Sequence, residues 1–284
     1  MSFQKIGVVG SGIMGSGVTE VAATTGASVL VCSRTTERAD AVLVAIDQSL
    51  ARQVEKGKRD VEEAAEVRRR ITATTEVKDL AECDFVMETV VEDLAVKLEL
   101  FATLGSVVAP TTVIATCTST LPVIDLAMQV EHPERVCGVH FFNPVTVMAL
   151  VEVVRPISAS DDTIDAAIDF VRACGKEPIE VKDQAGFIVN ALLFPYLNNA
   201  VRILEQGVAT REGIDAAMKG GCGFPMGPFA LLDLVGLDTS LAILDALYAE
   251  YADANFAPVP LLRRMVSAGQ LGRKSGAGFY QYPR

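Results

Sequence analysis

The sequence has no basic tract, no Cys-x-x-Cys pair and no apolar stretch long enough to cross a membrane. Its formal net charge at pH 7 is −11, because 36 acidic residues outnumber 25 lysines and arginines. Nucleic acid and anionic membranes are therefore disfavoured as partners. A membrane span needs about 20 consecutive apolar residues, and a secretory leader places charge before a shorter apolar run. Because the sequence shows neither, we expect a soluble, cytoplasmic protein.

Patterns that bind metals or form disulfide frameworks are also missing. Six cysteines form no close pair, and the only histidines are His132 and His140. Zinc sites and disulfide frameworks need cysteines or histidines at characteristic spacings. We therefore expect no metal site, and thiols that are buried and reduced.

The chain begins with a pattern typical of nucleotide binding. An apolar run over residues 6–9 leads into Gly10-x-Gly12-x-x-Gly15, and a helical pattern follows. In this arrangement Gly10 permits the tight turn, Gly12 lets the backbone approach a pyrophosphate, and Gly15 allows close packing of helix on strand. Free N–H groups at the helix start then hold the anion. The predicted dinucleotide-binding residues here are Gly10, Gly12, Ile13, Met14 and Gly15.

The first half of the chain alternates strand and helix patterns, which predicts a doubly wound, mainly parallel sheet. Strand patterns also occur at 28–32, 85–87, 113–115, 136–141 and 150–154, with helical patterns near 13–25, 93–105 and 161–173. A longer amphipathic region, about 36–70, has a break at Lys56-Gly-Lys-Arg59. We interpret it as a helical hairpin inserted into a Rossmann-type domain that spans residues 1–183.

Beyond this domain only helical spacing is found, at 186–206, 210–219, 228–234, 238–251 and 259–269. The predicted fold class is therefore α/β, with an N-terminal Rossmann-type doubly wound sheet and an all-helical C-terminal domain over 184–284. The chain of 284 residues, 50% hydrophobic, suits two such domains. The first helix of the second domain is rich in apolar residues, so we expect this domain to mediate a homodimer.

Several further motifs, in this order along the chain, point to one enzyme family. Together with the glycine-rich turn they are Glu88-Thr-Val-Val-Glu92 with Lys97, Thr118-Ser119-Thr120-Leu-Pro122, His140-Phe-Phe-Asn-Pro144, Val151-Glu152-Val-Val154, Gly186-Phe-Ile-Val-Asn190, Met226-Gly-Pro228, Asp233-Leu-Val-Gly-Leu-Asp238 and Gly272-Arg-Lys-Ser-Gly-Ala-Gly-Phe-Tyr280. The chain resembles the short-chain 3-hydroxyacyl-CoA dehydrogenases over essentially its whole length, and most closely the bacterial 3-hydroxybutyryl-CoA dehydrogenases.

The resemblance implies four catalytic residues. His140 matches the general base of the family, and imidazole suits that role because its unperturbed pKa is near about 6.5. Glu152 matches the carboxylate that orients the imidazole and stabilises the imidazolium, and adjacent strands are about 5 Å apart, within its reach. Ser119 matches the serine that hydrogen-bonds the substrate oxygen beside the nicotinamide. Asn190 is expected to face the substrate from the second domain.

The resemblance also implies binding residues for the cofactor and for coenzyme A. Glu92, Lys97, Ser119, Asn143 and Lys274 match cofactor contacts, although both lysines could instead lie on solvated helix faces. Ser49, Lys56 and Ser119 are expected to bind the CoA substrate, and Lys58 and Arg59 could share the phosphate charge near Lys56.

Two positions depart from the family pattern. The second strand usually ends in an aspartate that accepts the ribose hydroxyls of NAD, but Ser33 stands there, followed by Arg34. A small polar residue followed by a cation favours the 2′-phosphate of NADP, with NAD as the open alternative. Cys117 stands where the family has asparagine before the catalytic serine, which weakens one hydrogen bond and is compatible with an altered substrate.

These patterns predict an NAD(P)-dependent oxidoreductase that interconverts 3-hydroxyacyl-CoA, such as 3-hydroxybutyryl-CoA, and 3-oxoacyl-CoA. One alternative keeps the chemistry but places the acyl group on an acyl carrier protein. Another, from a different class, is a redox sensor that binds the dinucleotide without turnover, although a sensor needs no general base. Acyl length, physiological direction and pathway stay open.

Overall fold

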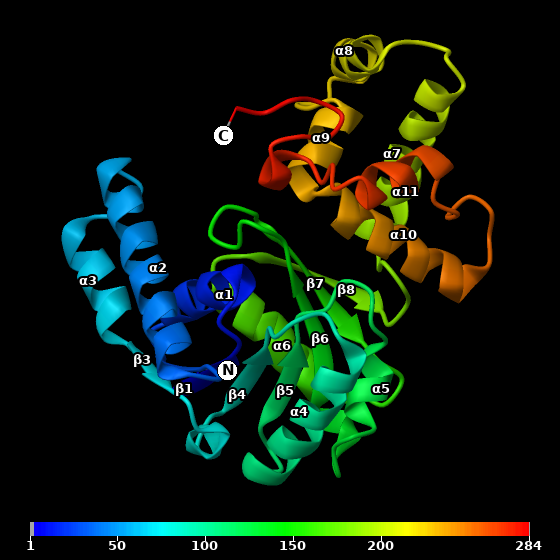
Figure 1. Ribbon diagram of the computed structural model, residues 1–284. Coiled ribbons are helices and arrows are strands. Elements are labelled where there is room, and N and C mark those ends of the chain that lie inside the picture. The colour runs from blue at the N-terminus through cyan, green and yellow to red at the C-terminus, as the bar shows by residue number, and fades with distance from the viewer. Residues whose placement is uncertain (1–2, 284) are drawn as a thin grey trace. The chain divides into compact units, whose positions relative to one another are not determined.

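The structure is a computed structural model that describes residues 3–283. The chain divides into two compact units, residues 1–184 and residues 185–284. Figure 1 shows a sheet with flanking helices in the first unit and helices throughout the second. This confirms the predicted fold class, a doubly wound sheet followed by an all-helical part.

The first unit is built on an eight-stranded sheet of order β3-β2-β1-β4-β5-β6-β7-β8. Neighbouring strands from β3 to β6 are parallel, β7 is antiparallel to β6, and β8 is parallel to β7. The strand bounds are β1 (Lys5–Val9), β2 (Ser28–Cys32), β3 (Ile71–Thr74), β4 (Phe85–Glu88), β5 (Val113–Thr116), β6 (Val136–Phe141), β7 (Leu150–Arg155) and β8 (Glu177–Lys182).

Helices cover both faces of this sheet (Figure 1). They are α1 (Ile13–Ala23), α2 (Thr36–Glu55), α3 (Val61–Arg69), α4 (Leu94–Val107), α5 (Val123–Ala127) and α6 (Asp161–Ala173). On the α6 side, Phe170 stacks on Phe85 with ring centroids 4.4 Å apart, and Phe3 meets both rings edge-on. Aromatic pairs of this kind add about 0.5–1.5 kcal/mol beyond the area they bury. These ring contacts hold α6 against β4 in the middle of the sheet.

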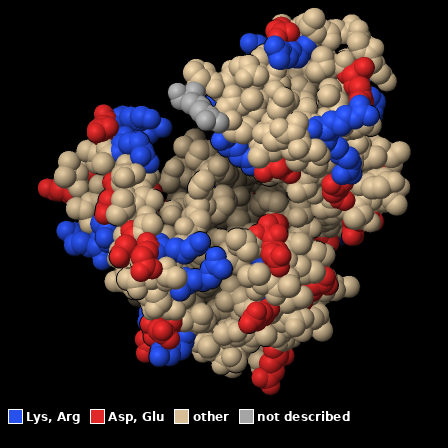
Figure 2. All heavy atoms as spheres, in the orientation of Figure 1, with Lys and Arg blue, Asp and Glu red and all other residues tan. Residues whose placement is uncertain are grey.

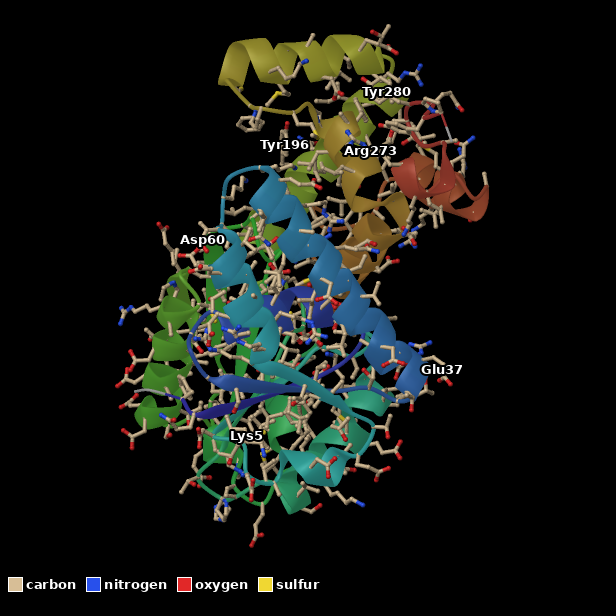
Figure 3. All side chains as sticks on the ribbon, turned by 90° about the vertical axis from the view of Figure 1, so that its left-hand side faces the viewer. Lys5, Glu37, Asp60, Tyr196, Arg273 and Tyr280 are labelled. Carbon is tan, nitrogen blue, oxygen red and sulfur yellow. The ribbon has the colours of Figure 1, made fainter. Side chains whose placement is uncertain are left out.

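Residues 36–70 form a helical hairpin of α2 and α3. In α2, Val42, Ile46 and Leu50 are buried at helical spacing, so one stripe of the helix faces the core. The side chain of Thr35 caps α2 and that of Asp60 caps α3, each accepting a backbone N–H three residues on. Figure 3 shows Asp60 at the turn of the hairpin, with Glu37 at the other end of α2.

Two strands and one α-helix of the first unit were not predicted from the sequence. Strands β3 and β8 lie at the two edges of the sheet. Strand β3 has four residues, and β8 mixes charged residues with Pro178 and exposes most of its side chains. Helix α5 has only five residues, and the carboxylate of Asp183 accepts hydrogen bonds from the N–H groups of Val123 and Ile124 at its start. Such short or edge elements carry little periodic signal.

The second unit packs five α-helices around its own apolar core: α7 (Val189–Glu205), α8 (Arg211–Cys222), α9 (Pro228–Val235), α10 (Leu237–Tyr251) and α11 (Pro260–Ser267). Two buried aspartates bind the C-terminal segment. Asp233 accepts from the N–H groups of Phe279 and Tyr280 at 2.8 Å, and Asp215 accepts from the Tyr280 hydroxyl at 2.9 Å. A Cβ at Gly278 would lie 2.0 Å from the Asp233 carboxylate, which explains glycine there. Figure 3 shows Tyr280 on this segment.

None of the helices formed by residues 3–283 is both long enough and apolar enough to cross a membrane.

Candidate active site

The glycine-rich turn has the geometry that a dinucleotide needs. Gly10 has φ of +134°, and a Cβ there would lie 2.4 Å from Thr89 Oγ1. A Cβ at Gly15 would lie 2.3 Å from the Gly10 carbonyl oxygen, so α1 packs closely on the turn. Gly12, the N-cap of α1, has open space where a Cβ would stand and provides no side-chain cap. The helix start therefore offers its N–H groups to a ligand, which fits a bound pyrophosphate.

The carboxyl ends of β5 and β6 and the amino-terminal half of the antiparallel strand β7 bring three predicted residues together. Ser119 Oγ lies 3.0 Å from His140 Nε2, and His140 Nδ1 lies 2.7 Å from Glu152 Oε2. His140 and Glu152 are register partners across the antiparallel β6–β7 pair and are both buried, whereas Ser119 follows β5. A carboxylate accepts only, so Nδ1 carries the proton and Nε2 presents its lone pair to the serine hydroxyl. This arrangement can take a proton at Nε2.

The turn that carries Ser119 is held by a glutamate. Glu92 Oε1 accepts from Thr118 Oγ1 at 2.6 Å, from the Ser119 N–H at 2.8 Å and from the Thr120 N–H at 3.2 Å. Thr118 Oγ1 in turn accepts from the N–H of Leu121 at 2.9 Å. The predicted cofactor residue Glu92 thus lies within the same hydrogen-bond network as the predicted catalytic serine.

Lys97 does not lie on a solvated helix face. Its side chain is fully buried, and its Nζ lies 2.7 and 2.8 Å from the two carboxylate oxygens of Glu88. Burial raises the pKa of the Glu88 carboxyl, while Lys97 and hydrogen bonds from Thr116 and Val90 oppose that rise. Glu88 and Thr116 were not predicted as site residues, because the sequence alone does not reveal that Lys97 and Thr116 both contact the Glu88 carboxylate.

Cys117 is partly buried beside this network. Desolvation raises the pKa of its thiol to about 12. The group is therefore a neutral thiol near pH 7 and a poor nucleophile.

A cavity of about 350 Å³ joins further predicted residues of the first unit. Gly12 and Ile13 of the glycine-rich turn, Ser49 of α2 and Asn143 after β6 all line it. Lys56 is the exposed C-cap of α2 at the hairpin tip. The wall also contains Glu20 and Arg52, which the sequence did not single out.

The first of the two departures from the family pattern, Ser33 with Arg34, directly follows β2. Ser33 is 4% exposed, and its hydroxyl has no hydrogen-bond partner among residues 3–283. Arg34 follows it and is exposed. A buried hydroxyl without a partner is uncommon in folded proteins and is consistent with a place for a ligand atom.

Two predicted residues belong to the second unit. Asn190 lies in the first turn of α7 and is 7% exposed. Lys274 pairs with Asp238, with Nζ 2.6 Å from Oδ1. Lys274 therefore has a charged partner within its own unit.

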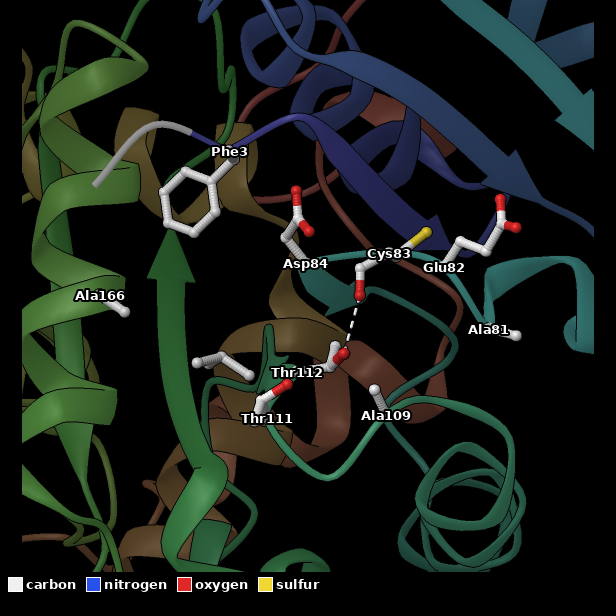
Figure 4. A pocket seen from close by; sticks show the side chains of 10 residues that line it. Phe3, Ala81, Glu82, Cys83, Asp84, Ala109, Thr111, Thr112 and Ala166 are labelled. Atoms are coloured by element: carbon white, nitrogen blue, oxygen red, sulfur yellow. Dashed lines mark hydrogen bonds between the residues drawn. The ribbon is translucent and has the colours of Figure 1, made fainter.

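A second hollow, of about 450 Å³, lies at the amino ends of the central parallel strands (Figure 4). Phe3, Cys83, Asp84 and Thr112 line it, and Thr112 Oγ1 donates to the Cys83 carbonyl at 2.7 Å. Neither of the two histidines lines this hollow. The Ser119–His140–Glu152 chain lies at the other end of the strands, where β5 and β6 have their carboxyl ends.

A glycine-rich dinucleotide turn and a histidine polarised by a glutamate lie together at the carboxyl ends of the parallel strands. This combination defines the class of nicotinamide-dependent dehydrogenases. The comparisons with known proteins specify the family. Residues 5–184 match the family "3-hydroxyacyl-CoA dehydrogenase, NAD binding domain", and residues 186–282 match "3-hydroxyacyl-CoA dehydrogenase, C-terminal domain". The chain therefore belongs to the 3-hydroxyacyl-CoA dehydrogenase family.

Named relatives agree over full length. A 3-hydroxybutyryl-CoA dehydrogenase of Clostridioides difficile is 42% identical over 98% of this chain and 99% of its own. One of Mycobacterium tuberculosis is 45% identical over 99% of each chain. The crystal structure of (S)-3-hydroxybutyryl-CoA dehydrogenase PaaH1 from Ralstonia eutropha has a TM-score of 0.97 at 38% identity and covers all of both chains. The predicted family is confirmed, and with it an oxidoreductase that uses a nicotinamide dinucleotide.

Proposed function

We propose that this protein interconverts short-chain 3-hydroxyacyl-CoA and 3-oxoacyl-CoA, with 3-hydroxybutyryl-CoA and acetoacetyl-CoA as the substrate pair. The observation that carries the proposal is the Ser119–His140–Glu152 chain. It lies at the carboxyl ends of the parallel strands, as the glycine-rich turn does. Relatives with the same fold are named for this substrate, which supports the short acyl chain.

In the oxidative direction His140 is the general base. Its Nε2 takes the proton of the 3-hydroxyl group while the C3–H bond breaks and its electron pair leaves as hydride, so that a C=O bond forms. When bound, the dinucleotide provides the hydride acceptor. Ser119 Oγ, 3.0 Å from Nε2, hydrogen-bonds the same substrate oxygen, and Glu152, 2.7 Å from Nδ1, stabilises the imidazolium. In the reductive direction His140 returns the proton.

We infer that the second unit completes the site. Asn190 provides a side-chain amide at the start of α7, and Lys274 provides a cation already neutralised by Asp238. Their proposed roles are to contact the substrate and the cofactor respectively. The roles of Asn190 and Lys274 rest on the family resemblance, which matches both residues.

The proposed cofactor preference is for NADPH over NADH. Ser33 cannot accept both ribose hydroxyls as a carboxylate would, and its unpartnered hydroxyl together with Arg34 suits a 2′-phosphate. A well-formed charge-assisted contact contributes about 1.5–3 kcal/mol, and each 1.36 kcal/mol is tenfold in rate. We therefore expect kcat/KM to favour NADPH by about ten- to a hundredfold.

The proposed acyl carrier is coenzyme A, bound along the α2–α3 hairpin. Ser49 lines the cavity beside the glycine-rich turn, and the tip of the hairpin carries Lys56, Lys58 and Arg59. Figure 2 shows basic side chains gathered at this tip, although the whole chain has a net charge of −11. A small cationic group of this kind suits the phosphates of a nucleotide.

We further propose a homodimer formed through the second unit. Leu192, Val208 and Leu234 expose 71%, 70% and 49% of their surface, which supports an apolar contact face. Sedimentation at micromolar concentration tests this, and a clean monomer would contradict it.

The activity is tested by steady-state reduction of acetoacetyl-CoA, with NADPH and NADH compared at equal concentration. Turnover with the CoA ester at micromolar KM supports the proposal. Turnover with acetoacetyl carried on an acyl carrier protein, but not on CoA, would replace the proposed carrier. Binding of dinucleotide without any turnover would support a sensor instead.

A further inference from the structure

A buried charged pair lies directly behind the turn that carries Ser119. Glu88 and Lys97 are both 0% exposed, and Lys97 Nζ contacts both carboxylate oxygens of Glu88. Withdrawing two charges from water often costs more than their attraction returns, so an apolar pair of the same volume would frequently be more stable. A role in stability alone is therefore a weak explanation for this pair.

The first connection between Glu88 and the turn that carries Ser119 runs through the end of β5. Thr116, the last residue of β5, is fully buried, and its Oγ1 donates to Glu88 Oε2 at 2.6 Å. The N–H of the next residue, Cys117, donates to the Glu88 carbonyl at 2.8 Å. Main chain and side chain of Glu88 thus both bind the point at which the chain leaves β5, three residues before Ser119.

The second connection runs through Lys97. Its Nζ lies 3.4 Å from the Cys117 carbonyl oxygen and 3.7 Å from Glu92 Oε2. Glu92 holds the turn by accepting from the Ser119 N–H at 2.8 Å. Lys97 therefore compensates the charge of the carboxylate that shapes the turn, and Glu88 orients Lys97.

From these contacts we propose that Glu88 is a positioning residue of the reaction: through Thr116 and Lys97 it fixes the turn that presents Ser119 Oγ to His140 Nε2. The inference rests on the proposed function, because it takes the Ser119–His140 pair as the reacting pair. Glu88 is fully buried and acts through Ser119 rather than on the substrate.

Two threonines, one at the last residue of β5 and one directly before its first residue, provide a matched test. Thr116 donates to Glu88 at 2.6 Å, and Thr112 donates to the Cys83 carbonyl at 2.7 Å in the hollow of Figure 4. Both are buried, and they are about 13 Å apart along the strand. The variants Thr116→Val and Thr112→Val therefore each remove a hydroxyl group and one buried hydrogen bond, at opposite ends of β5.

Steady-state reduction of acetoacetyl-CoA and thermal unfolding are measured for both variants. We expect Thr116→Val to lower kcat about tenfold, with both KM values changed less than about twofold, because it misplaces Ser119 without removing a binding contact. Thr112→Val should keep kcat within about twofold, with a similar loss of melting temperature in both variants. Equal kcat in the two variants would overturn the inference.

A double-mutant cycle then tests whether Thr116 and Glu88 act through Ser119. In a Ser119→Ala background, Thr116→Val should lower kcat by less than about twofold, because the group that it positions is already gone. Glu88→Gln is measured in the same two backgrounds. If Glu88→Gln alone does not fold, Glu88→Gln combined with Lys97→Met replaces the buried pair by neutral groups. Losses that multiply independently of Ser119 would contradict the inference.

The unmodified protein separates this inference from the proposed function. Failure to reduce acetoacetyl-CoA with either dinucleotide would refute the proposed function and the inference together. An active protein in which Thr116→Val behaves like Thr112→Val would refute the inference alone.

Discussion

At the ring of His140 the two nitrogen atoms face different chemical groups, and this difference sets their protonation. Glu152 faces Nδ1 at 2.7 Å and Ser119 Oγ faces Nε2 at 3.0 Å. The proton therefore resides on Nδ1, and Nε2 is the nitrogen atom that can accept another. The chemistry of the site follows from one ring held by two partners of opposite hydrogen-bonding character.

Replacing His140 by glutamine should lower kcat by about 10²–10⁴, the usual contribution of a general base, without loss of the fold. Glu152→Gln should also be slow, because the imidazolium loses its counter-charge. Steady-state rates and circular dichroism check both variants. A His140→Gln variant with near-normal kcat would remove His140 from the mechanism.

The cysteines should differ sharply in reactivity. Burial raises the pKa values of Cys32 and Cys83 to about 11 and those of Cys117, Cys137 and Cys174 to about 12, whereas Cys222 is exposed. A raised thiol pKa means that the proton stays on at pH 7.5, so the nucleophilic thiolate is absent. We expect maleimide to label one thiol rapidly at pH 7.5, and Cys222→Ser to abolish that label. Rapid labelling of Cys117 would contradict the described burial.

The preference for NADPH should depend on two residues. Ser33→Asp combined with Arg34→Gln adds a carboxylate and removes a cation, so repulsion of the 2′-phosphate should reverse the preference toward NADH. The ratio of kcat/KM for the two cofactors measures this in both proteins. If the unmodified protein clearly prefers NADH, Arg34 does not bind a 2′-phosphate.

Among the elements, those with a long apolar pattern were predictable and those defined by their neighbours were not. Strands β1, β2, β6 and β7 are buried apolar runs, and the sequence located each of them. Strands β3 and β8 gain their structure from pairing at the sheet edges, which no local pattern encodes. Lys97 is a similar case, since its burial depends on a carboxylate nine residues earlier on another element. The Ser119, His140 and Glu152 geometry needed the register of β6 and β7.

The hairpin tip allows a prediction at this scale. Lys56→Ala should raise KM for acetoacetyl-CoA about three- to tenfold with unchanged kcat, because it removes one of the proposed phosphate contacts. Arg69→Ala is the control: Arg69 lies on α3 of the same hairpin but pairs with Glu66. An equal rise of KM in both variants would indicate a general effect of charge, without a phosphate site at the tip.

On the scale of the whole molecule, each unit has its own apolar core. The first contains the glycine-rich turn and the Ser119–His140–Glu152 chain, and the second contains Asn190 and Lys274. This division of predicted residues makes the requirement for both units testable.

A fragment of residues 1–184 should fold and bind dinucleotide but reduce no acetoacetyl-CoA, because Asn190 and the proposed dimer contact lie beyond its end. Fluorescence of bound NADPH measures the first property and steady-state assay the second. Full activity of the fragment would show that the second unit has no part in the reaction.

The ladder between β6 and β7 makes the His140–Glu152 pair a property of alignment, since these two residues are direct partners in it. Successive side chains on a strand point to opposite faces, so one inserted residue within either strand would turn one partner away from the other. The loop over residues 142–149 is not part of that ladder. A change in the length of this loop would therefore leave the alignment of His140 with Glu152 unchanged, in evolution or in a designed library, whereas an insertion within either strand would not.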